Sequence, residues 1–296
     1  MDSMQFAQVI PRLRVLETRL LDKAKIDRMI DGDSANEALK VLQESEYANV
    51  MTGVKRAEDY EIVLSKELKR VYELMYDISP EKSLVDLMAI KYDYNNLSDL
   101  PSFMRSGIEK AKEVFEGTTD PQQIDIILDN SMFEEMKEIS KELNDRFVDK
   151  YVSALIDLTN LKTLLRVKKQ NKARDFLQQV IINGGAIGED TLVALLNDAP
   201  ENISNKLTFT DYSEVIKSGL EDYIKTGSSS LLEKLIDNYI MDMMREAKFI
   251  PFGVEPLLAY IYAKETEIKV VRIIMVGKLN NISGEVIRER LRDIYV

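Results

Sequence analysis

The strongest candidate for chemistry in this sequence is a cluster of charged side chains inside an apolar segment near the C-terminus. Residues 257–276 are largely apolar, yet the segment contains five charged residues: Lys264, Glu265, Glu267, Lys269 and Arg272. Carboxylates beside amines could serve general acid–base catalysis, or they could fix the register of packed helices.

The spacing of two of these residues favours the structural interpretation. On a helix, Leu257, Ile261, Glu265, Ile268 and Arg272 follow steps of four and three, so a carboxylate and a guanidinium share the apolar stripe. Charged groups on a packed face are costly unless they are paired or hydrogen-bonded. The sequence offers no partner base for catalysis, so we predict a structural network, with partner binding as the lesser alternative.

Two asparagines receive the same interpretation. Asn96 and Asn160 occupy places in "DYNNLSDL" and "DLTNLKTLL" that match the charged cluster in "KETEIKVVR". Each of these segments has a polar residue, two mixed positions, a second polar residue and then Leu or Ile. We therefore predict that Glu265, Arg272, Asn96 and Asn160 form structural polar contacts.

The composition excludes most catalytic sites. The 296 residues include no histidine and no cysteine, so the usual acid–base group, thiol nucleophiles, disulfides and thiolate metal sites are absent. The segment "NGGAIGED" lacks the spacing and context of a phosphate-binding loop. We predict no catalytic, cofactor-binding or metal-binding residue and no cofactor. An enzyme built on Asp, Glu, Lys, Ser or Tyr remains a distant alternative.

The charge and hydropathy of the chain also limit its partners. The formal net charge of −11 disfavours nucleic acid and anionic membrane surfaces as direct partners. No window is apolar enough to span a bilayer, and the N-terminus lacks the order of a secretory signal. We expect a cytoplasmic protein.

The segments that must position the polar residues have the sequence periodicity of α-helices. In "EIVLSKELKRVYELMY", apolar residues recur at steps of three and four with Lys and Glu opposite them. The 12 glycines and 7 prolines cluster at a few breaks between such segments. Asp120 before Pro121, Ser283 and Gly188 are predicted to begin helices. We predict an all-α fold of three related helical modules, at 1–110, 111–205 and 206–296.

The C-terminal stretch resembles a known family signature. It contains a Pro-x-Gly-x-x-Pro entry at 251–256, a Tyr-containing helix running into Ala-Lys-Glu at 260–265, Gly-Lys at 277–278 and Ile-Arg-Glu-Arg-Leu at 287–291. These motifs are similar to those of the C subunit of the bacterial and archaeal V/A-type ATPases, the counterpart of the d subunit of eukaryotic V-ATPases. The N-terminal "RLRVLETRLL" and "ALKVLQESEY" also resemble this family, so the similarity covers the whole chain.

The resemblance implies a non-catalytic rotor part. Members of this family are funnels of three all-α modules with approximate threefold symmetry, on the cytoplasmic face of a membrane rotor ring. They receive the central shaft and couple it to a ring that moves protons or sodium ions. The implied partners are the ring subunit and the shaft subunits, with a monomer when isolated and contact with the membrane only through the ring. A generic cytoplasmic α-helical adaptor is the alternative.

Overall fold

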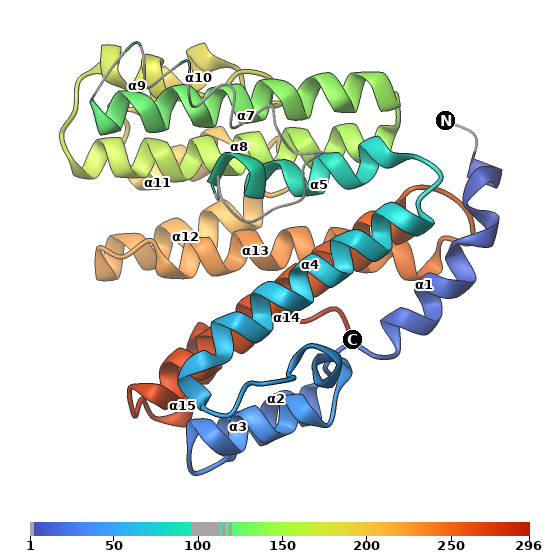
Figure 1. Ribbon diagram of the computed structural model, residues 1–296. Helices are drawn as coiled ribbons and strands as arrows, with labels where there is room; N and C mark the ends of the chain where they lie inside the picture. The colour runs from blue at the N-terminus through green and yellow to red at the C-terminus, as the bar shows by residue number, and fades with distance from the viewer. Residues whose placement is uncertain (1–2, 96–112, 114–116, 118–119) are drawn as a thin grey trace. The chain divides into compact units, whose positions relative to one another are not determined.

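The computed structural model describes residues 3–95, 113, 117 and 120–296, and all regular secondary structure in these ranges is helical (Figure 1). The all-α prediction is confirmed. No helix within the described ranges is both long enough and apolar enough to cross a membrane. The α-helices are α1 (Ile10–Glu17), α2 (Lys23–Asp31), α3 (Ala35–Gln43), α4 (Tyr60–Ile78), α5 (Lys82–Asn95), α7 (Pro121–Leu143), α8 (Arg146–Lys169), α9 (Arg174–Val180), α10 (Glu189–Leu195), α11 (Pro200–Lys206), α12 (Ser213–Thr226), α13 (Ser230–Arg245), α14 (Glu255–Leu279) and α15 (Gly284–Arg290), with short 3₁₀ helices η1 (Ser3–Gln8), η2 (Glu46–Val50), η3 (Ala57–Asp59) and η4 (Glu246–Phe249).

The chain forms two compact units, and the second unit combines both ends of the sequence. The first unit lies between Asp86 and Tyr239, and the second joins the segment before Asp86 to Ile240–Val296. The boundaries fall inside α5 and α13. The division into sequential modules at 1–110, 111–205 and 206–296 is a different partition and stays a prediction.

The second unit is organised around α14, which contacts α1, α2, α3, α4 and α15. Figure 1 shows α4 and α14 lying along one another. The apolar stripe of α4 faces inward, since Val63, Leu64, Val71 and Met75 are buried. Each fully buried aliphatic side chain contributes roughly 1.5–3 kcal/mol relative to an exposed one.

The first unit contains the long pair α7 and α8, joined by a two-residue turn. Asn144 ends α7 in the left-handed conformation with φ 46°, and the Asp145 carboxylate accepts from Phe147 N at 2.9 Å to cap α8. At the start of α7, Asp120 caps the helix by accepting from Gln122 N at 3.0 Å, and Pro121 occupies the first helical position. The predicted cap at Asp120 is confirmed.

Helices α8 and α14 end in the same way, although they belong to different units. An asparagine with positive φ follows each helix, Asn171 at 51° and Asn281 at 54°. The next amide then reaches back five residues, and the Ile282 N to Gly277 O distance is 2.9 Å. This hydrogen-bond pattern is a Schellman motif, and it turns the chain into a short helix, α9 or α15. Ser283 caps α15, as predicted.

A lysine near each of these C-termini holds a second short helix. The Lys168 ammonium of α8 donates to Asp198 O at 2.7 Å, just beyond the end of α10. The Lys278 ammonium of α14 donates to Gly32 O at 2.6 Å, just beyond the end of α2. Each long helix therefore holds a carbonyl group that follows the last turn of a short helix.

The asparagine at the end of α14 gives a direct test of this ending. We expect Asn281→Val to lower the free energy of unfolding by roughly 1–2 kcal/mol, because a β-branched side chain disfavours positive φ. Asn281→Gly is the matched control and should cost nothing, since glycine adopts this conformation freely. Urea denaturation of both variants measures the difference, and equal midpoints would contradict the left-handed ending.

Candidate functional site

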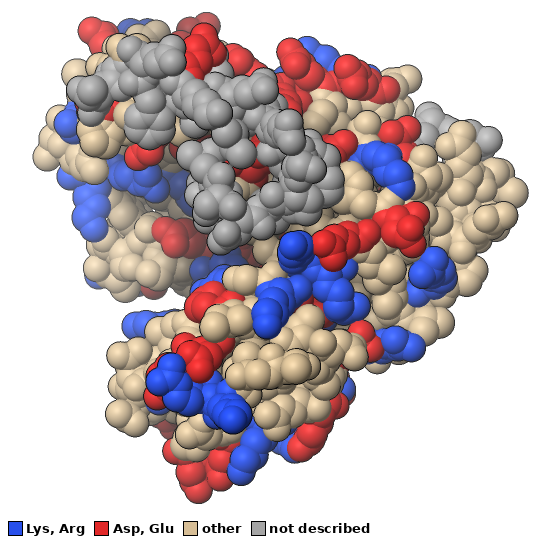
Figure 2. All heavy atoms as spheres, in the orientation of Figure 1, with Lys and Arg blue, Asp and Glu red and all other residues tan. Residues whose placement is uncertain are grey.

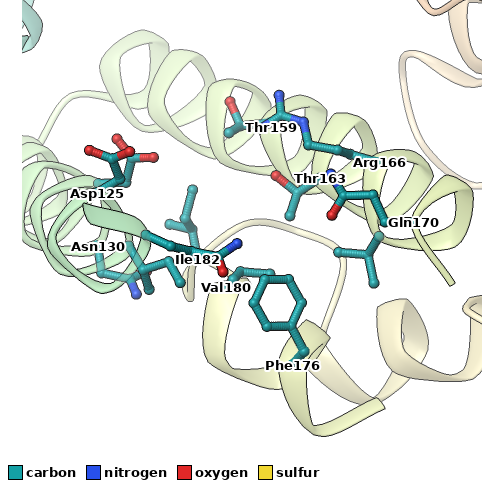
Figure 3. A pocket seen from close by; sticks show the side chains of 13 residues that line it. Asp125, Asn130, Thr159, Thr163, Arg166, Gln170, Phe176, Val180 and Ile182 are labelled. Carbon is teal, nitrogen blue, oxygen red and sulfur yellow. The ribbon is translucent and has the colours of Figure 1, made fainter. Parts of the chain in front are cut away.

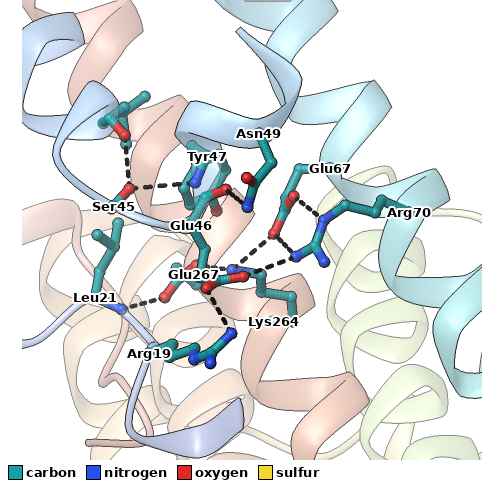
Figure 4. Close-up of polar contacts among 11 residues, drawn as sticks. Arg19, Leu21, Ser45, Glu46, Tyr47, Asn49, Glu67, Arg70, Lys264 and Glu267 are labelled. Carbon is teal, nitrogen blue, oxygen red and sulfur yellow. Dashed lines mark hydrogen bonds and ion pairs between the residues drawn. The ribbon is translucent and has the colours of Figure 1, made fainter.

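The central site of the second unit is a group of charged side chains buried where α14 crosses α4. The Lys264 side chain is 1% exposed, and its Nζ lies 2.7 Å from Glu267 Oε1 and 3.0 Å from Glu67 Oε1. Glu67 belongs to α4 and has a fully buried side chain. The ammonium also lies 4.6 Å from the ring centroid of Tyr47. Figure 4 shows these groups converging from three elements.

The ion pairs continue from this centre to the surface. Arg70 binds Glu67 with two parallel hydrogen bonds, both 2.8 Å long. One Arg70 nitrogen also lies 3.5 Å from Glu46, and Arg19 pairs with Glu46 at 3.1 Å. Charges alternate along the chain of contacts, with three cations and three carboxylates, so the buried members are compensated. We call these six residues, Arg19, Glu46, Glu67, Arg70, Lys264 and Glu267, the charge network.

One carboxylate of the charge network also binds the backbone. Glu267 accepts a hydrogen bond from the amide of Leu21. Leu21 lies directly before Asp22, which caps α2 by accepting from Lys25 N at 2.8 Å. The start of the α2–α3 pair is thus attached to the middle of α14.

The electrostatics of the site favour the charged form of Lys264. Burial alone would lower the pKa of Lys264, but Glu267 and Glu67 outweigh it and hold the pKa above its usual value. Burial raises the pKa of Tyr260 to about 12, with the neighbouring carboxylates adding to the shift and Lys264 opposing it. An enclosed lysine whose pKa is held above its usual value is unsuited to act as a general base near neutral pH. The arrangement is suited to fixing helix positions and not to catalysis.

The two charged residues predicted on the α14 stripe contact different residues of α4. Glu265 is buried and accepts from Tyr72 Oη at 2.7 Å. Arg272 pairs with Glu61 through hydrogen bonds of 2.7 and 3.0 Å, and both side chains are nearly half exposed, at 45% and 46%. The Arg272 hydrogen bond lowers the pKa of Glu61, with burial opposing it.

The exposure of Arg272 differs from the expected burial of the stripe, and the reason is local. In the last part of α14 and at its end, Arg272, Val276 and Asn280 are all exposed at steps of four. The neighbouring helices therefore leave one side of α14 uncovered toward its C-terminus. The stripe is buried at Glu265, but at Arg272, two turns later, it lies at the edge of the interface.

The predicted asparagine in the first unit makes a double contact with the backbone. Asn160 is buried on α8, where its amide donates to Ile182 O at 2.8 Å and accepts from Ile182 N at 2.9 Å. One turn earlier, the buried Asp157 carboxylate accepts from Ala186 N at 2.9 Å and from Ile187 N at 3.0 Å. Asn96 lies outside the described residues.

The centre of the charge network is visible in the sequence pattern, although the stripe of α14 alone does not single it out. Glu67 lies between Leu64 and Val71 at steps of three and four, so a carboxylate occupies a position of the buried stripe of α4. Lys264 and Glu267 are part of the charged cluster itself. Charged residues at buried positions of both helices indicate that the charges of α4 and α14 pair with one another.

Comparison with known proteins gives similarity over almost the whole chain. The family model described as ATP synthase (C/AC39) subunit matches residues 9–100 and 97–290. The C subunit of the V-type sodium ATPase of Enterococcus hirae is 28% identical over 99% of both chains. The C subunit of the A-type ATP synthase of Methanocaldococcus jannaschii is 25% identical over 98% of this chain and 87% of its own, and that of Pyrococcus abyssi is 26% identical over 96% and 89%.

Removing the central cation should destabilise the fold strongly. We expect Lys264→Met to lower the free energy of unfolding by roughly 3–5 kcal/mol, because it leaves the buried Glu267 without a cation and Glu67 with Arg70 alone. Arg272→Met removes a cation from the same helix but from an exposed pair, and should cost under about 1 kcal/mol. Chemical denaturation at neutral pH compares the two variants.

A triple variant separates the effect of charge from that of shape. Adding Glu67→Gln and Glu267→Gln to Lys264→Met removes both buried carboxylates. The amide oxygens introduced there can still accept from Arg70 and from Leu21 N, and Arg70 keeps Glu46 as an anionic partner. We expect this variant to recover a substantial part of the lost stability. A triple variant as unstable as Lys264→Met alone would show that packing, not charge, decides the stability of this site.

Proposed function

Because the chain belongs to the ATP synthase (C/AC39) subunit family, we propose that it is a non-catalytic central-stalk subunit of a rotary V/A-type ATPase. In this role it connects the central shaft to the membrane rotor ring, and the complex transports protons or sodium ions. The observation that carries the proposal is similarity to C subunits over nearly the full length of the chain.

The charge network supports a mechanical role. A part that transmits torque must hold its helices at fixed relative positions under load. In the second unit, buried ion pairs and a side-chain-to-backbone hydrogen bond join α4, α14 and the start of α2. Such contacts have strict geometry and strand a buried charge when they separate, so they resist sliding more than apolar contacts do.

The surface charge supports docking to the ring and not to nucleic acid. On the face in Figure 2, the Lys and Arg side chains lie among Asp and Glu and form no continuous basic surface over the described residues. The chain carries a formal net charge of −11, whereas cytoplasmic loops of membrane proteins are rich in Lys and Arg. A ring of many copies would present a repeated basic rim. The subunit then lies on the cytoplasmic side and reaches the membrane only through the ring.

Three modules with approximate threefold symmetry, arranged as a funnel around the shaft, complete this proposal. In this proposal the isolated chain is a monomer. A generic cytoplasmic helical adaptor is the competing function, and the two differ in the partners they retain.

Recovery of partners tests the assignment directly. We expect the tagged chain, purified from membranes in mild detergent, to bring down a ring-forming membrane protein and shaft subunits in fixed ratio. ATPase activity should accompany the complex and be absent from the chain alone. Recovery with unrelated soluble proteins, reproducibly and without a ring subunit, would favour the adaptor.

The salt dependence of assembly tests how the subunit docks. The screening length is about 10 Å at 0.1 M salt and shrinks to about 3 Å at 1 M. We expect association with the isolated ring to slow about tenfold or more between about 0.05 and 0.5 M salt, while dissociation changes less. Stopped-flow or surface-based kinetics measure both rates. An association rate that is flat or rises with salt would identify an apolar socket instead.

A further inference from the structure

A cavity of about 330 Å³ lies between α7, α8 and α9 in the first unit. Its size is within the range of small-ligand pockets, roughly 300–1,000 Å³. Figure 3 shows Asp125 and Asn130 of α7 on one side and Arg166, Thr163 and Gln170 on the other, at α8 and its C-terminal end.

The floor of the cavity is apolar. It is formed by Val167 of α8, Phe176 and Val180 of α9, and Ile182 in the loop that follows α9. The same loop is held by Asn160 through its two hydrogen bonds to Ile182. The floor is therefore attached firmly to α8, and a hydrocarbon chain would find a preformed surface there.

Among the described residues that line the cavity, carboxylates outnumber cations. Asp125 and Asp129 lie one turn apart on α7, and Arg166 is the one cation among the described lining residues, which leaves a formal charge of −1. Burial and then the neighbouring Asp125 raise the pKa of Asp129, while Arg166 opposes them. Two carboxylates that repel one another over an apolar floor are complementary to an additional cation.

We propose that this cavity binds an aliphatic monocation, with an ammonium or guanidinium head at Asp125 and Asp129 and its hydrocarbon stem on the apolar floor. Asn130, on the same side of the cavity as Asp125, offers a further oxygen acceptor for the head group (Figure 3). The inference is independent of the rotor proposal, because it rests on the first unit alone.

Calorimetric titration of the full chain with n-butylguanidinium, at fixed ionic strength, tests the proposal. We expect Asp125→Asn and Asp129→Asn each to weaken binding about five- to tenfold, and the double variant to abolish it. Glu138→Gln is the matched control, because it removes the same charge from an exposed position of α7 outside the cavity. Equal affinities of these variants, or no measurable binding, would overturn the proposal.

The length of the stem tests the role of the floor. From methyl- to butylguanidinium, affinity should rise about fourfold per methylene, as expected for burial of hydrocarbon. An affinity that does not depend on stem length would reduce the site to surface ion pairing and contradict the proposal.

A variant on the opposite rim distinguishes a monocation from a zwitterion. Arg166→Gln should tighten binding of butylguanidinium, because it removes a competing cation. The same variant should not improve binding of a ligand with an added carboxylate. Weaker binding of butylguanidinium to Arg166→Gln would overturn the assigned charge preference.

Comparison of two probes identifies the source of the cation. N-acetyl-arginine amide represents an arginine side chain of another polypeptide, and butylguanidinium represents a free metabolite. Similar affinities support a polypeptide side chain, whereas binding of butylguanidinium alone supports a free alkyl cation. Both results agree with the proposed ligand class, and failure of both probes to bind contradicts it.

Discussion

The ammonium of Lys264, enclosed by Glu67 and Glu267, is the interaction on which the second unit depends. A charge removed from water is stable only when its partners are in place. The cation therefore requires α4 and α14 to meet in one register. Through Glu267 it also requires the amide of Leu21 at one position. Apolar packing supplies most of the favourable free energy, but it would tolerate small sliding movements that the ion pairs do not.

In both units, polar side chains of a long helix bind the backbone of a neighbouring loop. A polar side chain in the middle of a long helix binds the backbone of a loop: Asn160 holds Ile182, and Glu267 holds Leu21. A lysine near the end of each long helix then holds a carbonyl group at Asp198 or Gly32. Counted back from the left-handed asparagines, the position on α8 that matches Glu267 is Asp157, one turn before Asn160, and its carboxylate accepts from Ala186 N and Ile187 N. Hydrogen-bonding capacity at that point is therefore the shared requirement.

Local features were predictable from the sequence, and distant partners were not. The helical class, the inward stripe of α4 and the cap at Asp120 depend on neighbouring residues, so periodicity and capping rules predict them. The sequence also located a buried charge in α14. It could not identify Leu21 as a partner of Glu267, because 246 positions separate them and no local rule joins them. The exposure of Arg272 depends on where the neighbouring helices stop, which periodicity does not describe.

The joining of both chain ends in one unit affects how the protein is made. Helices α1 to α4 are synthesised long before α14. The hydrogen-bond partner of Leu21 is Glu267, which lies 246 positions later in the chain. At about 5–20 residues per second, that interval is roughly 10–50 s. During this time Glu67 has Arg70 as a partner but lacks Lys264, the buried cation that completes its site. The second unit can therefore form completely only after the C-terminal helices have been synthesised. A prematurely terminated chain lacks α14, against which its N-terminal helices pack.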